Sequence, residues 1–465
     1  MKQYDYDVLV VGSGPGGQSA ALQAASLGKR TGLVERKPRL GGVSLQTGTI
    51  PSKALREAAW LTSRFAARGM RATLQTPVQQ HHNFLGEAVG RKQRVIESQE
   101  ALLLQQLMSG GVTLLPGEAS FHDPHTLNIR HADGKPARQT AGVIILATGS
   151  RPRRPVDVPF DRERVLDSTS ILKLRHLPEQ LLVVGGGVIA CEFATMFAPL
   201  VVQVSLIDSH EHLLAYLDDD IQKILEDDLR DMAVQLHMQT RVSTIRRTGN
   251  RVSVSTGDGA ELEGDMLLYA LGREPNYDTL ELEQAGLAAD DHGWVRVNRH
   301  HQTACEHIYI IGDLAGRPSL AATAMEQGRL AINHAFDRQH THPSGPLPMA
   351  IYTIPELSYI GETERELQAR AAAYVVGRAR FAETARGLII GEEHGFMKLL
   401  ADPVTHALLG IHIIGESASE LVHIGQMAMT CKAPVEILAD TVFNYPTLAQ
   451  CYKTAALDCL QQLRS

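Results

Sequence analysis

The chain contains 465 residues, of which 44% are hydrophobic and 21% charged, and its formal net charge is −7. A chain of this length divides into roughly two to four domains, and the composition is that of an ordinary soluble protein. The negative charge disfavours nucleic acid or an anionic membrane as a partner, and no apolar run approaches the ~20 residues needed to cross a bilayer.

Neither the N-terminus nor the cysteines indicate export. Residues 1–7 are polar and acidic, unlike a signal peptide. An odd number of cysteines without a Cys-x-x-Cys pair argues against a secreted disulfide framework, so we expect a cytoplasmic protein with reduced, mostly buried thiols. The five cysteines are Cys191, Cys305, Cys431, Cys451 and Cys459.

Three histidine clusters lie in polar, loop-like sequence without the spacing of a metal site. We therefore predict no metal ligands among them and expect solvated loops. The clusters are His81–His82, His300–His301 and the pair His340 and His342.

The N-terminal stretch predicts a strand, a glycine turn, a helix and a second strand. Residues 7–11 form an almost continuous apolar run, as in a parallel strand that is buried on both faces. A glycine-rich turn occupies residues 12–17, a helix is predicted over residues 18–27, and Thr31–Glu35 is the second strand. The whole is a βαβ unit of the dinucleotide-binding type.

Each fingerprint residue of this unit has a separate physical task. Gly12 permits the tight turn, Gly14 lets a pyrophosphate approach the backbone, and Gly17 lets the helix pack on the strand. The N-terminus of the helix supplies amide donors and a favourable dipole. Glu35 ends the second strand, where an acid accepts hydrogen bonds from a ribose.

A polar connector over residues 65–84 and a long amphipathic helix over residues 85–108 are predicted next. Strand-like segments follow, and a buried strand over residues 141–147 leads into Gly149. The arginine- and proline-rich run at residues 151–159 indicates a crossing between domains.

A second βαβ unit begins at residue 180. Its glycine turn holds Gly185, Gly187 and Ala190, and Ala190 replaces a third glycine, which the fingerprint tolerates. The next strand ends in Asp208. Two such units in one chain indicate nucleotide binding far more strongly than either unit alone. A further buried strand at residues 265–271 runs into Gly272.

The last third of the chain carries one more strand-end signature and a separate C-terminal region. A strand at residues 308–311 leads into Gly312 and Asp313, and a helix-like stretch containing Ala321 follows. Residues 340–348 are rich in histidine and proline and are typical of a linker. Beyond them, strands and helices mix up to the C-terminus.

These blocks, in this order, resemble the class I pyridine nucleotide-disulfide oxidoreductases, the family of lipoamide dehydrogenase and glutathione reductase. The resemblance centres on residues 40–55, which read Leu-Gly-Gly-Val-Ser-Leu-Gln-Thr-Gly-Thr-Ile-Pro-Ser-Lys-Ala-Leu. In the family this segment contains two redox-active cysteines before Ile-Pro-Ser-Lys. Ser44 and Thr49 stand at those positions here, and a hydroxyl cannot form a disulfide or a charge-transfer thiolate.

A second departure from the disulfide reductases agrees with the first. Tyr445 and Gln450 stand where those enzymes place the histidine and glutamate that serve the dithiol, and a phenol and a neutral amide make a poor proton relay. Residues 48–55 and 443–447 are similar instead to the Si-specific transhydrogenases of the family. That group commonly keeps one cysteine where Ser44 stands.

The resemblance implies an α/β fold with two Rossmann-like dinucleotide-binding domains, for FAD and for NAD(P), and a C-terminal α+β dimerisation domain. The expected boundaries are residues 1–155 and 276–345 for the FAD domain, 156–275 for the NAD(P) domain and 346–465 for the dimerisation domain. The implied partners are pyridine nucleotides and a second copy of the chain, so a homodimer is expected.

The resemblance also assigns roles. Lys53 and Glu192 are expected to form an ion pair beside flavin N5, where Lys53 stabilises negative charge on the reduced flavin. The residues expected to bind FAD are Gly12, Gly14, Gly17, Glu35, Gly42, Ser52, Lys53, Gly149, Asp313 and Ala321. Those expected at the pyridine nucleotide are Gly185, Gly187, Ala190, Glu192, Asp208 and Gly272.

The implied activity is ping-pong hydride transfer from NADPH to NAD⁺ through bound FAD. The cofactors are therefore FAD, NAD(H) and NADP(H). Asp208 favours NAD(H), because an acid at this place binds a ribose 2′-hydroxyl and repels a 2′-phosphate, and residues 209–214 contain no arginine. Two alternatives stay open, an NADH-dependent diaphorase, quinone reductase or oxidase, and a nonenzymatic FAD-binding redox sensor.

Overall fold

The computed structural model describes residues 4–65, 78–131, 133–290, 293–316, 318–338 and 346–464. The chain forms two compact units. The first unit combines Met1–Ala54, Glu87–Arg153 and Gly272–His342, and the second combines Leu55–Gly86, Arg154–Leu271 and Pro343–Ser465. Every helix within the described ranges is too short or too polar to cross a membrane.

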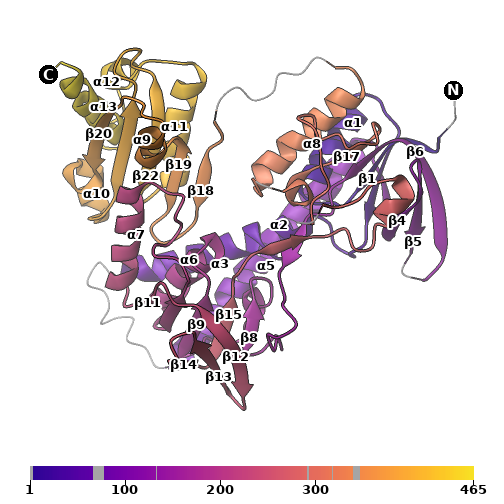
Figure 1. Cartoon of the computed structure of the whole chain (residues 1–465), viewed down its shortest axis with the longest axis horizontal. Coiled ribbons are helices and arrows are strands. Elements are labelled where there is room, and N and C mark those ends of the chain that lie inside the picture. Colours follow the sequence, from indigo (N-terminus) through magenta and orange to yellow (C-terminus); the bar gives the residue numbers. More distant parts are fainter. Residues whose placement is uncertain are drawn as a thin grey trace. The chain divides into compact units, whose positions relative to one another are not determined.

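A parallel sheet organises the first unit (Figure 1). Its parallel strands follow the order β3-β2-β1-β6-β17, and β5 and β4 extend the sheet from β6 as antiparallel strands. Apolar clusters cover both faces, which explains why β1 reads as a continuous apolar run. The strands are β1 (Tyr6–Val11), β2 (Thr31–Glu35), β3 (Thr113–Pro116), β4 (Glu118–Asp123), β5 (Thr126–Arg130), β6 (Pro136–Leu146) and β17 (Ile308–Ile310).

Two helices, α1 (Pro15–Ser26) and α8 (Ala321–Ala335), lie side by side in this unit (Figure 1). Their close approach depends on glycine, since a Cβ placed on Gly328 would lie 2.4 Å from the carbonyl oxygen of Gly16. A two-stranded ribbon of β7 (Ser150–Pro152) and β16 (Arg273–Pro275) completes the described strands of the unit.

Three further helices follow the second strand: α2 (Gly42–Gln46), α3 (Thr49–Phe65) and α5 (Val78–Ser109). The sequence analysis predicted that the long amphipathic helix, α5, starts at residue 85. This was wrong, because α5 begins at Val78. Part of the predicted connector is therefore helical, and the backbone of His81–His82 is helical rather than a loop; residues 66–77 lie outside the described ranges.

The second unit contains a parallel sheet of order β11-β10-β9-β15-β8, which repeats the order of the first four parallel strands of the first unit but has at its edge a strand, β8, that precedes β9 in the chain. Helix α6 (Val188–Phe197) follows β9, helix α7 (Asp219–Asp231) follows β10, and a three-stranded antiparallel sheet, β12-β13-β14, precedes β15. The strands are β8 (Val165–Asp167), β9 (Gln180–Val184), β10 (Gln203–Ile207), β11 (Gln235–His237), β12 (Val242–Thr248), β13 (Arg251–Thr256), β14 (Glu261–Gly264) and β15 (Met266–Tyr269).

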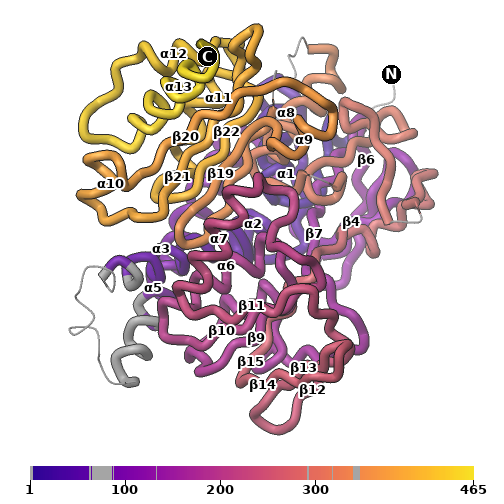
Figure 2. The backbone as a smooth tube through the Cα atoms, turned by 60° about the vertical axis from the view of Figure 1, so that its left-hand side comes forward, coloured from indigo at the N-terminus to yellow at the C-terminus, as the bar shows by residue number. Residues whose placement is uncertain are grey.

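The C-terminal part of the second unit is an antiparallel sheet of order β18-β19-β22-β21-β20, whose strands run alongside one another in Figure 2. One large apolar cluster joins this sheet to α11 and α13. The elements are β18 (Met349–Ile351), β19 (Leu357–Gly361), α9 (Glu364–Ala369), β20 (Val375–Arg380), α10 (Ala385–Ile390), β21 (Phe396–Ala401), β22 (Leu408–Ile414), α11 (Ala418–Thr430), α12 (Glu436–Asp440) and α13 (Gln450–Leu463).

Candidate functional site

The first glycine turn lies where the strand order of the first unit's sheet reverses, between β1 and β6. Gly12 has a φ of 103°, and a Cβ there would lie 2.5 Å from the Ala147 carbonyl oxygen at the end of β6. A Cβ on Gly17 would lie 1.9 Å from the Gly12 oxygen, so neither position accepts a side chain. A Cβ on Gly14, by contrast, would meet none of the described atoms within 4 Å. Gly14 is the N-cap of α1 and has no side chain to cap it, which leaves an open turn for an anion at the helix N-terminus.

Glu35, at the end of β2, is fastened to the same turn. Its Oε2 accepts hydrogen bonds from the Ser13 amide (2.9 Å) and hydroxyl (2.6 Å), and its Oε1 accepts one from the Lys37 amide (2.8 Å). A carboxylate accepts about four hydrogen bonds, so capacity for a ribose hydroxyl remains. Ser13 also accepts a hydrogen bond from the Gly41 amide (3.0 Å). Sequence reasoning missed this role of Ser13, because its partners are 22 and 28 residues away.

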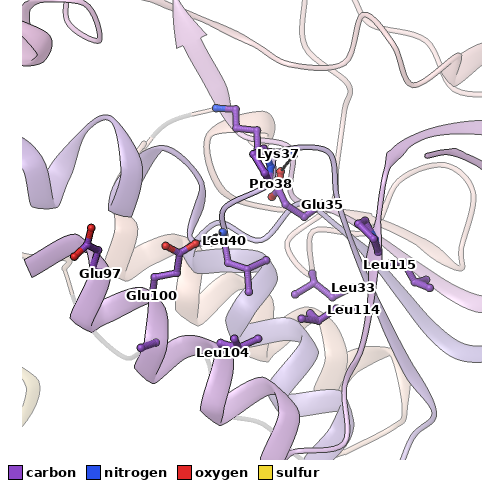
Figure 3. A pocket seen from close by; sticks show the side chains of 12 residues that line it. Leu33, Glu35, Lys37, Pro38, Leu40, Glu97, Glu100, Leu104, Leu114 and Leu115 are labelled. Atoms are coloured by element: carbon purple, nitrogen blue, oxygen red, sulfur yellow. Dashed lines mark hydrogen bonds between the residues drawn. The ribbon is translucent and has the colours of Figure 1, made fainter. Parts of the chain in front are cut away.

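A cavity of about 470 Å³ opens beside Glu35 (Figure 3). Leu33, Leu114 and Leu104 supply apolar walls, and Glu100 on α5 stands across from Glu35. Glu100 accepts a hydrogen bond from the Leu40 amide (2.9 Å) and pairs with Arg39, so it anchors the loop after β2 to α5. The volume and the mixture of apolar walls with a few acids are typical of a nucleotide pocket. Sequence reasoning missed Glu100, which reads as an ordinary polar residue of an amphipathic helix.

The segment around residues 40–55 brings Gly42 against the first turn, since a Cβ on Gly42 would lie 2.8 Å from Gly14 Cα. Ser44 lies in α2, and Thr49 is the first residue of α3. The Ser52 hydroxyl donates to the Thr49 carbonyl (3.2 Å), and Lys53 Nζ lies 3.4 Å from Ser52 Oγ.

The predicted ribitol-binding residue Asp313 follows β17. Its Oδ2 accepts a hydrogen bond from the Ser150 hydroxyl (2.5 Å) and lies 3.8 Å from the Arg273 guanidinium, which also donates to Ser150. Gly149 has a φ of 69° and adjoins Ser150. Ala321 is the first residue of α8. Ser150 and Arg273 were not predicted, although the glycine turns that precede them in the sequence could have indicated both.

The second glycine turn repeats the first within the second unit. Gly185 has a φ of 120°, and a Cβ there would lie 3.0 Å from the Ala270 carbonyl oxygen at the end of β15. Gly187 is the N-cap of α6, and none of the described atoms lies within 4 Å of where its Cβ would be. Ala190 is buried in α6. Gly272, which the sequence assigned to this nucleotide, belongs to the first unit, whereas the other predicted residues belong to the second.

Asp208, just after β10, is 7% exposed. Its Oδ1 accepts hydrogen bonds from the amide (2.8 Å) and the ring Nδ1 (2.6 Å) of His210, which leaves Oδ2 to accept from a ligand hydroxyl. His212 lies 3.3 Å from Glu226 instead. The sequence named these histidines but not their separate partners.

Glu192, also buried in α6, accepts a hydrogen bond from the Tyr352 amide (2.9 Å), and Thr195 accepts one from Ile354 (3.1 Å). The buried Arg56 donates to the Thr353 carbonyl oxygen that lies between them and pairs with Glu356 at 3.2 Å. Burial lowers the pKa of Arg56, and the carboxylates around it oppose that effect. Lys53 belongs to the first unit and Glu192 to the second.

The five cysteines are free thiols, and Cys191, Cys451 and Cys459 are buried, Cys431 being exposed. Cys191 adjoins Glu192. Burial, and then the charges of Glu192 and Asp208, raise the pKa of its thiol far above the ordinary value, so it stays protonated. Of the histidine clusters, His300–His301 lies in a turn, where His300 stacks on His334, and the side chains of the other two clusters lie outside the described set.

Two protein-family descriptions match the sequence of this chain. Residues 6–328 match "Pyridine nucleotide-disulphide oxidoreductase", and residues 347–456 match the dimerisation domain of the same family. A soluble pyridine nucleotide transhydrogenase of Mycobacterium bovis is 43% identical, covering 99% of this chain and 98% of its own. One from Yersinia pestis is 39% identical, covering 99% of each chain.

Solved structures agree with these matches. LpdA from Mycobacterium tuberculosis superposes with a TM-score of 0.89 at 28% identity, covering 97% of this chain and 99% of its own. RclA from Escherichia coli, a flavoprotein disulfide reductase, gives 0.86 at 26% identity with the same coverage. Together the comparisons confirm the predicted fold class, with FAD and NAD(P) domains and a C-terminal dimerisation domain built on an antiparallel sheet.

Proposed function

The chain belongs to the pyridine nucleotide-disulphide oxidoreductase family, whose members bind FAD and NAD(P), and we propose that it is a transhydrogenase that passes hydride from NADPH to NAD⁺ without a redox-active disulfide. Relatives that are 39% and 43% identical over nearly their whole length carry the name of that activity, which supports the proposal.

The observation that carries the proposal is the pair of hydroxyls at Ser44 and Thr49 in a chain whose two dinucleotide turns are intact. Electrons cannot pass to a disulfide that these residues are unable to form. Cys191 is no substitute, because its thiol is buried and protonated. The electron acceptor must therefore reach the flavin itself, and a second pyridine nucleotide can do so at the site that the first has left.

The first unit fits FAD. The open space at Gly14 admits a pyrophosphate, the cavity beside Glu35 admits an adenosine, and Asp313 and Ser150 can exchange hydrogen bonds with a ribitol chain. FAD supplies a reversible two-electron hydride acceptor when it is bound. The protein contributes binding, orientation and electrostatics.

Lys53 and Glu192 are the proposed catalytic residues. The Lys53 ammonium would stabilise negative charge that develops on the isoalloxazine, as a fixed cation at a low-dielectric site. The Glu192 carboxylate also accepts a hydrogen bond from the Tyr352 amide. This bond fixes the position of the carboxylate relative to the segment at residues 352–356. This makes Glu192 a positioning residue within its own unit as well as the proposed partner of Lys53.

The pyridine nucleotide is proposed to bind at Gly185, Gly187 and Ala190, with its adenosine ribose at Asp208 and its nicotinamide near Gly272. The Asp208 carboxylate suits the 2′-hydroxyl of NAD(H), and the His210 ring that donates to it reduces the charge that a 2′-phosphate would meet. This arrangement supports the use of both nucleotides at one site.

Anaerobic stopped-flow absorbance tests the proposal. The flavoprotein would be mixed with NADPH and, separately, NADH, and the reduced flavin would be chased with thio-NAD⁺. We expect both nucleotides to bleach the flavin and the chase to reoxidise it rapidly. Lys53→Met should slow the bleaching about 100-fold, and Lys135→Met, an exposed lysine, should leave it unchanged.

A different result would identify one of the alternatives. Bleaching by NADH alone, with reoxidation only by quinone or oxygen, would refute transhydrogenation and favour a diaphorase or oxidase, for which Asp208 is the supporting residue. Failure of both nucleotides to bleach the flavin would favour a redox sensor.

We also propose a homodimer formed through the dimerisation domain. Large apolar side chains of this domain are exposed in the single chain, which supports a partner surface. They include Met427 (61% exposed), Val442 (92%), Tyr445 (73%) and Leu457 (51%). Light scattering coupled to size exclusion should give twice the mass of the chain, and a monomer mass at micromolar concentration would refute the dimer.

A further inference from the structure

Helix α7 has a cluster of carboxylates at each end. The two clusters differ in the positively charged side chain that pairs with them. At the start of the helix, Asp218, Asp220 and Glu364 surround the ammonium of Lys398, which lies 2.7, 2.8 and 2.6 Å from them. Lys398 and Asp218 are each 1% exposed, so this cluster contains its own buried cation. A metal ion has no place there.

The cluster at the end of α7 contains no such cation. Asp228 and Asp231 lie three residues apart on one face of the last turn, and His394 approaches them from the loop between α10 and β21. His394 Nδ1 lies 2.5 Å from Asp228 Oδ1 and 4.0 Å from Asp231 Oδ2. One potential ligand atom from each of the three residues lies within 4.8 Å of the other two, which is close enough to surround one ion.

An independent observation is that one carboxylate oxygen of this cluster has no partner among the described residues, although His394 pairs with the other oxygen of Asp228. Asp228 is 5% exposed, and its Oδ2 is buried without a hydrogen-bond partner among the described residues. A buried carboxylate oxygen in this state costs free energy unless a cation or proton neutralises it. It also lies in the last turn of a helix, where the dipole disfavours negative charge.

The neighbouring charges add to this imbalance. Glu392 and Glu393 directly precede His394 and bring two more carboxylates to the same loop. The nearby cations have other partners: Arg64 pairs with Glu416, and Arg230 pairs with Asp227 and Glu226. The carboxylates that pair with these two arginines therefore lie outside the cluster of Asp228, Asp231 and His394.

We propose that Asp228, Asp231 and His394 form a binding site for a divalent transition-metal ion, with Zn²⁺ as the ion that the ligand set suits best. One imidazole and two carboxylates with one open position are a ligand set that zinc accepts, and an imidazole disfavours Mg²⁺ and Ca²⁺. The ion takes the place of the proton between His394 Nδ1 and Asp228, and that proton leaves to solvent. The site lies within the second unit and fastens α7 to the loop before β21.

Isothermal titration tests the site on the full FAD-loaded chain, with any affinity tag removed and bound metal first stripped by a chelator. Zn²⁺ is titrated in the presence of excess Mg²⁺. We expect saturable binding of one Zn²⁺ per chain, at least about tenfold weaker in Asp228→Asn and His394→Gln. Asp231→Asn should weaken it likewise, and its side chain is 69% exposed, so this variant keeps the fold.

The matched control is His406→Gln. His406 pairs with Glu436 as His394 pairs with Asp228, but the pair has no third ligand, so its loss should leave Zn²⁺ affinity unchanged. Zn²⁺ should raise the melting temperature of the unmodified chain and of His406→Gln but not that of the three site variants. The proposal is wrong if the unmodified chain shows no saturable Zn²⁺ binding. It is also wrong if the Zn²⁺ affinity of Asp231→Asn stays within tenfold of that of the unmodified chain. The same holds for Asp228→Asn or His394→Gln, provided that the variant folds.

Discussion

The two glycine turns have the same architecture and differ in how their surroundings are fastened. In both, the first glycine has a positive φ and lies against the carbonyl that ends a neighbouring strand, and the N-cap glycine faces open space. In the first turn, however, the strand-end acid Glu35 holds Ser13, a residue of the turn itself. In the second turn, the strand-end acid Asp208 holds His210, an exposed residue that lies after the strand.

This difference matches the expected lifetimes of the two ligands. A turn tied to its own strand-end acid, beside a cavity bounded by α5, is suited to a resident cofactor such as FAD. A turn whose acid, among the described residues, accepts its hydrogen bonds from a residue at the surface is suited to a nucleotide that must enter and leave in each cycle. Preorganisation favours tight binding, because less freedom is lost when the ligand enters.

The largest effect is expected from a methyl group in the first turn. Gly17→Ala places a Cβ 1.9 Å from the Gly12 oxygen, and relieving that overlap costs about 3 kcal/mol or more. We expect a protein with little bound FAD, measured as the ratio of flavin absorbance to protein absorbance. Ala190→Gly makes the reciprocal change in the second turn and should keep its FAD, at a cost of at most about 1 kcal/mol. Equal FAD content in both variants would contradict the stricter packing of the first turn.

A smaller effect is expected from the hydroxyl that fastens the first turn. Ser13→Ala removes the hydrogen bond to Glu35 and the acceptor for the Gly41 amide. A hydrogen bond to a charged group is worth about 1.5–3 kcal/mol, so the Kd for FAD should rise at least about tenfold. Fluorescence titration of the apoprotein measures it. Ser26→Ala, at the end of the helix that follows the turn and with its hydroxyl bonded to the Gln23 carbonyl, is the control and should bind FAD normally. An unchanged Kd in Ser13→Ala would mean that the Glu35 bond does not preorganise the site.

The sequence was sufficient for the parts of these sites that depend on local geometry. A glycine between an apolar strand and a helix permits few backbone conformations, so Gly12, Gly14, Gly185 and Gly187 could be placed as turn residues from their spacing. The repeated parallel sheets followed from apolar runs that recur with the same turns. The start of α5 was missed because residues 79–83 are polar, and a polar stretch has no apolar periodicity to separate a helix from a connector.

What the sequence could not predict are partners brought together by the fold. Glu100 reaches the loop after β2 from 60 residues away, and Lys398 meets Asp218 across 180 residues. Charged residues of this kind read as surface residues in a linear pattern, since only tertiary structure buries them. Lys398, in the middle of a strand, shows this best, because it is fully buried while its neighbours in β21 form an ordinary apolar core.

The smallest effect is expected at the exposed side of the second turn. His210→Ala leaves the Asp208 carboxylate without the ring that donates to it, so the 2′-phosphate of NADPH should meet more negative charge. A pair in which one partner, His210, is exposed to solvent is worth about 0.2–1 kcal/mol, which lowers kcat/KM for NADPH roughly 1.5- to 5-fold relative to NADH. Flavin reduction by each nucleotide measures the ratio. His212→Ala is the matched control, since His212 lies against Glu226 rather than Asp208, and it should leave the ratio unchanged. If both histidines change the ratio equally, the discrimination arises from the net charge of the loop rather than from the Asp208–His210 contact.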